Sequence, residues 1–372
     1  RENMLASAPS LSARNSAARR ICCRAGGERS RMTTRLDLTR SQILAFRCRV
    51  AALDERLPRG QDALRRAAWA GLQDSMPRAA LLSIHARMAG TEPETWEDPS
   101  LIQIWGPRFS AYVVAKRDLA VFTLGRLPSE AGPLKRAQDI AARLQVALGG
   151  RRMMYGAAAR AMGATNANQL RYAAPTGTVV IRWDGSHQPD VWNVPAPDID
   201  PHEARLELAR RYVHMFGPAT PDAFATWAGI GLVSGKAAFE TLGTSLTQVR
   251  TPIGAAWILS QDEPLFRSAP GSVAPARLLP SGDTWFLLQG ADRELLVPDE
   301  SQRRALWTSR VWPGALLVEG ETVGIWRRAG HVLTIQPWQR LSQTQRQAVE
   351  AEAALLPLSG IARPIEVCWD DG

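Results

Sequence analysis

Residues 210–259 read RRYVHMFGPATPDAFATWAGIGLVSGKAAFETLGTSLTQVRTPIGAAWIL, and this stretch decides the fold class. Its pattern predicts three consecutive helices, the third beginning near Ser234, and then the strands LTQVRT and AAWILS around Pro252-Ile253-Gly254. Two strands joined by a tight turn after three helices are typical of a winged helix. The stretch therefore indicates a DNA-binding module.

The second helix of this stretch has clear signals at both ends. Thr220 is a favourable N-cap residue, Pro221 suits the first helical position, and Asp222 places a negative charge in the positive first turn. Gly229 and Gly231 end the helix, because glycine readily leaves helical geometry.

The composition is that of an ordinary globular protein with two or three domains. Of the 372 residues, 45% are hydrophobic and 22% are charged. No uninterrupted apolar run approaches the roughly 18 to 20 residues that span a bilayer, so we expect no membrane association. The net charge is +9, but +5 of it lies in residues 1–31 and only +4 in residues 32–372. The folded part is thus predicted to be mildly basic.

Residues 1–31 differ in composition from the rest of the chain. They are rich in Ser, Ala and Arg and contain two acidic residues. Three interpretations remain open: upstream sequence that is not translated, a disordered tail, or an organellar targeting segment. Met32 lies just before the first predicted helix and is a natural start. We predict a disordered leader over residues 1–31, whose arginines do not count toward DNA binding.

Helices followed by a hairpin recur three times along the chain. In the first recurrence, Thr39 begins a capping box, DALRRAAWAGLQ predicts a helix that ends near Gln73, and Pro77 opens another helix. The hairpin strands LIQIW and AYVVAK follow. In the last recurrence, LLVEG and ETVGIWRR form the hairpin. We predict an α+β protein of three tandem winged-helix units, over residues 32–150, 151–260 and 261–372.

Several classes of site are missing from the sequence. The five histidines are scattered without metal-ligand spacing. GLVSGK is one residue too short for a P-loop, and no glycine fingerprint of a dinucleotide fold occurs. We therefore expect no metal and no nucleotide cofactor. The cysteines lack C-x-x-C spacing, which fits a reducing cytoplasm; they are Cys22, Cys23, Cys48 and Cys368.

Three separated segments together resemble the bacterial winged-helix DNA glycosylases of the AlkZ and YcaQ type. The segments are RRYVHMFGPATPDAFATWAGI, RLLPSGDTWFLLQGADRELLVPDESQRRALW, and LLVEGETVGIWRR with the later VEAEAALL. The resemblance covers most of residues 38–357. It implies three tandem winged helices around a concave, basic channel for double-stranded DNA, and the removal of alkylated purines or the unhooking of cross-links. We expect the chain to act as a monomer.

The resemblance also implies a catalytic motif, Gln-x-Gln or Gln-x-Asp, where the second helix turns into the third. Gln73-Asp74-Ser75 stands at that position, so Gln73 matches and Ser75 does not. Gln73 can orient a water at the sugar C1′, whereas the Ser75 hydroxyl cannot replace a carboxylate as a base. Either Asp74 restores an acid–base group by pointing into the channel, or Asp74 or Ser75 caps the helix opened by Pro77, and we favour the cap.

Basic and aromatic residues provide candidate DNA contacts. Arginine is suited to phosphates, and a solvated surface is the alternative for each position. Lys236 is the single basic residue of the predicted recognition helix, which argues against reading of base sequence. Trp183, beside a predicted turn, is a candidate stacking group. The full set is Arg65, Arg66, Arg78, Arg87, Trp183, Lys236, Arg327 and Arg328.

Two other functions compete with a glycosylase. A non-catalytic winged-helix DNA binder or regulator would bind duplex DNA without releasing a base. A protein-interaction module is favoured by the modest charge of residues 32–372, and it would show no salt-sensitive duplex binding.

Overall fold

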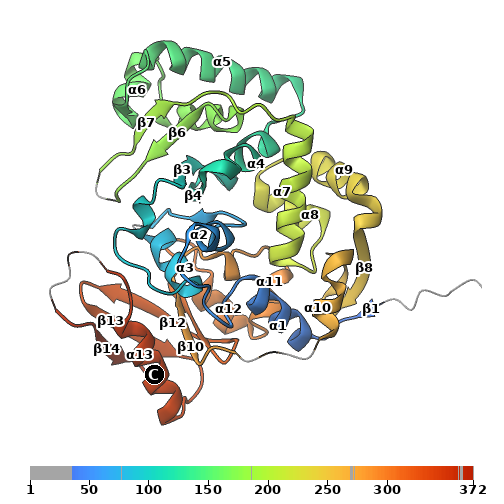
Figure 1. Cartoon of the computed structure of the whole chain (residues 1–372), viewed down its shortest axis with the longest axis vertical. Helices are drawn as coiled ribbons and strands as arrows, with labels where there is room; N and C mark the ends of the chain where they lie inside the picture. Colours follow the sequence, from blue (N-terminus) through green and yellow to red (C-terminus); the bar gives the residue numbers. More distant parts are fainter. Residues whose placement is uncertain are drawn as a thin grey trace, which may run out of the picture. The chain divides into compact units, whose positions relative to one another are not determined.

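The computed structural model describes residues 36–371 except 77, 186, 269, 270, 272, 359, 361 and 362. The predicted leader, residues 1–31, and the expected helix start at Pro77 lie outside these residues. The described chain is a mixed α+β protein, as the sequence predicted, and it contains three sheets (Figure 1). The described part forms one compact unit.

The stretch around residues 210–259 forms the elements that its sequence predicts. Three helices precede an antiparallel hairpin, and the short β1 pairs in parallel with the first hairpin strand, which the sequence did not indicate. The elements are β1 (Leu36–Asp37), α7 (Pro201–Phe216), α8 (Pro221–Ala228), α9 (Leu232–Leu242), β8 (Leu246–Thr251) and β9 (Gly254–Leu259).

The ends of α8 confirm the predicted signals. The Thr220 side chain accepts a hydrogen bond from the Ala223 N–H, and Pro221 occupies the first turn. Gly229 takes the left-handed conformation after the last helical residue, with φ of 70°. At the first helix of the chain, Thr39 and Gln42 form the predicted capping box.

A six-stranded sheet joins residues on both sides of position 150. Its strand order is β2-β4-β3-β6-β7-β5, and the neighbour of β3 on the far side is β6. Helix α5 packs Leu144 and Leu148 against Ile181 and Val191 of this sheet. The strands are β2 (Leu72–Gln73), β3 (Leu101–Trp105), β4 (Ala111–Ala115), β5 (Met153–Met154), β6 (Val179–Arg182) and β7 (Asp190–Asn193).

A five-stranded sheet forms the C-terminal part, in the order β10-β11-β12-β13-β14. Helix α13 buries Val349 and Ala353 in the same cluster as Leu316 and Leu333 of the sheet. The predicted hairpin is present as β11 and β12, while the parallel strand β14 was not predicted. The strands are β10 (Ala276–Leu279), β11 (Gly314–Val318), β12 (Glu321–Ala329), β13 (Val332–Pro337) and β14 (Glu366–Trp369).

The other helices pack against these sheets or against one another. They are α1 (Arg40–Val50), α2 (Gln61–Ala67), α3 (Ala79–Arg87), α4 (Leu119–Thr123), α5 (Ala131–Leu148), α6 (Tyr155–Ala161), α10 (Glu263–Arg267), α11 (Asp292–Leu296), α12 (Glu300–Leu306) and α13 (Gln343–Ala354).

The predicted helix that ends near Gln73 is wrong in its second half. Helix α2 stops at Ala67, and Leu72 and Gln73 form the edge strand β2, with Gln73 opposite Tyr112. Gly71 explains the change of direction, because its φ is +72° and a Cβ there would lie 3.1 Å from ring atoms of both Tyr112 and Phe122. Gln73 is therefore placed by sheet pairing and not by a helix terminus.

A buried ion pair ties α3 to the loop after β10. The two terminal guanidinium nitrogens of Arg87, Nη1 and Nη2, donate to the carboxylate of Asp283 at 2.7 Å. The side chains of Arg87 and Asp283 are 1% and 0% exposed. The Ser83 hydroxyl also donates to Asp283, at 2.6 Å. This bidentate geometry fixes the distance between the two segments.

We expect Asp283→Asn to lower the free energy of unfolding by about 3 to 5 kcal/mol, because Arg87 would keep its buried charge without a counter-ion. Urea denaturation measures this change. The control is Glu92→Gln, which removes the partner of Arg59 in an ion pair whose side chains are 60% and 59% exposed. The control should change stability far less, and equal effects would show that Arg87–Asp283 has no special structural role.

Candidate functional site

Gln73 lies at the edge of the six-stranded sheet, where three segments meet. Its amide nitrogen donates to the Ser75 hydroxyl at 3.2 Å. Its Oε1 is buried and has no hydrogen-bond partner among the described residues. Gly282, with φ of +75°, packs on the amide so closely that a Cβ would lie 3.1 Å from Gln73 Cδ and Nε2. The amide is thus held in place, and its acceptor oxygen is left in the interior without a hydrogen-bond partner among the described residues.

Asp74 is turned into the protein and is 1% exposed. Its Oδ1 accepts from the Ala80 N–H at 3.0 Å, and its Oδ2 accepts from Gln103 Nε2 at 2.7 Å. Burial raises the pKa of Asp74, although these two hydrogen bonds and the nearby Arg78 act in the opposite direction. Ala80 is the second residue of α3, so Asp74 makes the favoured capping interaction.

A cavity of about 260 Å³ is lined by Met76, the residue directly after the Gln73-Asp74-Ser75 turn, and not by the three turn residues themselves. Met76 and Val311 are among the larger apolar side chains exposed there, at 39% and 51%. Arg327 and Arg328 line the same cavity and are exposed on β12. Its other walls are Ala79, Leu82, Pro280, Ser281, Trp312, Pro313, Gly314 and Trp326. Apolar walls with a few polar groups are typical of a ligand site.

The predicted basic residues near Gln73 have different environments. Arg66 is exposed and available to a phosphate. Arg65 makes a two-point ion pair with Asp118 at 2.8 and 2.9 Å. Arg87 is a correction to the expected DNA contacts, because its guanidinium is buried against Asp283 and has no route to a phosphate in this structure.

Arg78 stacks on the ring of Trp96, and so does a residue that the sequence did not single out. The guanidinium carbons of Arg78 and Arg182 each lie 3.6 Å from the Trp96 ring centroid. Trp183 follows Arg182, and its indole N–H donates to the His187 carbonyl at 2.8 Å. The sequence could have suggested Arg182 only because it is next to the predicted turn. Its stacking on Trp96 depends on the fold and could not be predicted.

Lys236 is exposed on α9, far along the chain from the Gln73 turn, and the structure shows no contact that would assign it a role.

Among the described residues, no group of His, Cys, Asp or Glu could hold a metal ion. No helix in the described part of the chain is long and apolar enough to cross a bilayer.

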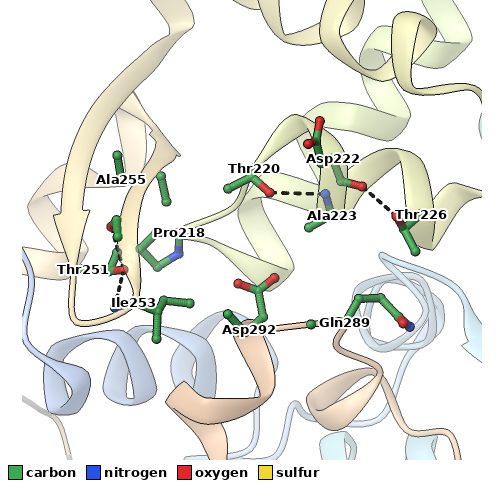
Figure 2. Close-up of a pocket in the computed structure, with 14 residues that line it drawn as sticks. Pro218, Thr220, Asp222, Ala223, Thr226, Thr251, Ile253, Ala255, Gln289 and Asp292 are labelled. Carbon is green, nitrogen blue, oxygen red and sulfur yellow. Dashed lines mark hydrogen bonds between the residues drawn. The ribbon is translucent and has the colours of Figure 1, made fainter.

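A larger cavity, of about 390 Å³, lies between α8, the β8–β9 turn and the start of α11 (Figure 2). The carboxylate of Asp292 is aimed into it, and Asp222 lies on its rim. No arginine or lysine lines this cavity. Its acidic lining makes it unsuitable for backbone phosphates, so we place the candidate site at the Gln73 turn.

Comparison with known proteins identifies the family. A family model described as "DNA glycosylase AlkZ-like" matches residues 66–357, which is more than half of the chain. The chain belongs to the AlkZ-like DNA glycosylase family. This membership agrees with the resemblance that the sequence indicated.

A sequence match and a structure match to this AlkZ-like chain both come from Streptomyces sahachiroi. An "Interstrand DNA cross-link repair glycosylase" is 26% identical over 212 residues, which are 55% of this chain and 53% of that protein. The chain thus spans about half the length of this relative. The solved structure of the DNA glycosylase AlkZ matches with a TM-score of 0.72 and 19% identity, over 90% of this chain and 100% of that one. The two structures share a fold.

We expect Asp74→Ala to lower the free energy of unfolding by about 1 to 2 kcal/mol, because the N-terminus of α3 loses its cap. Thermal or urea unfolding measures this effect. Ser75→Ala is the matched control, since Ser75 is exposed and adjacent, and it should leave stability nearly unchanged. A variant Asp74→Ala with normal stability but no enzymatic activity would instead assign Asp74 to the reaction.

Proposed function

We propose that this AlkZ-like chain hydrolyses the N-glycosidic bond of N7-alkylated purines in double-stranded DNA, with Gln73 orienting the attacking water. The Oε1 of Gln73 carries this proposal, because it is a buried acceptor without a hydrogen-bond partner among the described residues. Because Gln73 Nε2 donates to the Ser75 hydroxyl, Oε1 is the end of the amide that has no partner.

The chemistry of the substrate fits a site without an exposed carboxylate in the motif. An N7-alkylated purine already carries a positive charge, so it leaves without protonation by the enzyme. The remaining tasks are to position a water at C1′ and to stabilise the developing oxocarbenium charge. The amide oxygen of Gln73 can accept a hydrogen bond from that water, and its partial negative charge favours the cation. Ser75 serves to fix the amide.

The cavity beside the turn suits the displaced purine or its alkyl group. Met76, Leu82 and Trp312 provide apolar and aromatic walls against which a flat ring can pack. Arg327 and Arg328 stand at the same cavity and can contact phosphates of the strand that carries the lesion. The relative named for cross-link repair supports the extension of this substrate class to larger adducts.

DNA binding through shape and phosphates is part of the same proposal. We propose that the helices and hairpins of residues 32–150, 151–260 and 261–372 act as three winged-helix units on a duplex, with one chain per site. Lys236 is the one basic residue of α9, so this helix has few groups that could recognise base edges. This supports DNA binding that does not depend on the base sequence. No nucleotide cofactor or metal enters the proposed reaction.

A non-catalytic DNA binder is the second candidate function. It is favoured by the motif itself, since Asp74 is buried as a helix cap and Ser75 has no charge. Such a protein would hold the damaged duplex and leave the glycosidic bond intact.

We expect the full chain to release free N7-methylguanine from a duplex, and Gln73→Ala to lower the single-turnover rate by about 100-fold or more. Chromatography of the released base measures this rate. Gln169→Ala, which removes an exposed amide elsewhere, is the control and should keep wild-type activity. Tight duplex binding with no release by the wild-type chain would replace the glycosylase with the non-catalytic binder.

A further inference from the structure

Two arginines, Arg78 and Arg182, stack on the ring of Trp96. Trp96 lies in the short turn Thr95–Glu97 and is 5% exposed. The guanidinium carbons of Arg78 and Arg182 are each 3.6 Å from its ring centroid. Two guanidinium groups cannot occupy one such position, so they lie on opposite faces of the indole. The stack joins the start of α3 to the end of β6.

Stacking leaves the hydrogen-bonding edges of these two arginines unused. A guanidinium contacts an aromatic ring with its flat face, while its N–H donors point outward in the plane. Among the described residues, no side chain or carbonyl accepts a hydrogen bond from the Arg78 guanidinium, and its Nη1 is buried without a partner. Among the described residues, the ion-pair partner of Arg182 is Glu97, at 3.6 Å. Arg65 and Arg87 differ, because carboxylates occupy their donors.

The spacing of the two guanidiniums suits a nucleic-acid backbone. With one on each face of the ring, they lie at most twice 3.6 Å, or about 7 Å, apart, which is close to the distance between successive phosphates along one DNA strand. The indole between them keeps two like charges apart at a fixed distance. The nearest ion-pair partner, Glu97, is 57% exposed and 3.6 Å from Arg182, so it can be displaced by a phosphate at low cost.

Gln103 fixes the stack relative to the Gln73 turn. Its Oε1 accepts from the backbone N–H of Trp183 at 2.6 Å, and its Nε2 donates to Asp74 Oδ2 at 2.7 Å. Gln103 is 2% exposed and therefore connects the two segments in the interior. Arg182 is next to Trp183, and Arg78 follows the turn by a few residues. The free donors and the free oxygen of Gln73 are thus held on one rigid framework.

We propose that Arg78 and Arg182, separated by the Trp96 ring, bind two successive phosphates of the strand that carries the target nucleotide. This inference rests on the proposed function and adds a phosphate clamp to its site. The clamp binds any sequence, because its ligand is the DNA backbone. It positions the sugar of the target nucleotide against Gln73.

Salt-dependent binding to a short undamaged duplex tests the clamp. Fluorescence anisotropy gives the binding constant of the full chain over a range of KCl concentrations. Each phosphate contact contributes about 0.9 to the slope of log K against log salt. We expect Arg182→Gln and Arg78→Gln each to reduce this slope by about one. Arg182→Lys keeps the charge and should retain the wild-type slope with weaker binding.

Arg346→Gln is the matched control for the loss of a stacked arginine. Arg346 also lies over a tryptophan, Trp369, at 4.5 Å, but it is paired with Asp371 in the C-terminal sheet region. We expect this variant to keep the wild-type slope. A melting temperature near that of the wild type shows that each variant is folded.

Two results would overturn the clamp, and they differ in what they say about the enzyme. An unchanged slope in both folded variants, Arg182→Gln and Arg78→Gln, refutes the clamp while Gln73-dependent base release still supports the glycosylase. A wild-type chain that shows no salt-dependent duplex binding refutes both the clamp and the proposed function.

Discussion

The bidentate pair between Arg87 and Asp283 is the constraint on which the candidate site depends. It joins α3, which follows the Gln73 turn, to the loop after β10, in which Gly282 packs on the Gln73 amide. A buried charge pair of this kind is costly to desolvate, and its value lies in the fixed geometry that it imposes. Hydrogen bonds from Ser83 to Asp283 and from Arg87 to Thr284 reinforce the same junction.

The polar groups around the turn divide into those that are satisfied and those that are not. Both carboxylate oxygens of Asp74 accept hydrogen bonds, one from Ala80 and one from Gln103. The terminal nitrogens of Arg87 donate to Asp283. Gln73 Oε1 and Arg78 Nη1 have no partner among the described residues. Unsatisfied buried groups are uncommon in folded proteins, and these two lie at the turn where we propose that DNA binds. This division separates the framework of the site from the groups that we assign to substrate.

The sequence predicted those features whose causes are local. Thr220, Pro221 and Gly229 specify the ends of α8 by their own backbone chemistry, and strand alternation specified the hairpins. The strand at Gln73 was missed because its pairing partner is Tyr112, on β4, and short strands have little pattern of their own. The burial of Arg87 depends on a carboxylate 196 residues away. The stack of Arg182 on Trp96 likewise arises only from tertiary structure.

The central claim is that the reacting nucleotide lies at Gln73, against the free amide oxygen. The most direct measurement is a crystal structure of the full chain bound to a duplex with a cationic sugar analogue of the oxocarbenium state at the target position. We expect the C1′ position to be bridged to Gln73 Oε1 by one water, with the neighbouring phosphates near Arg78 and Arg182. A duplex bound on another face, with Gln73 remote from the analogue, would contradict the claim.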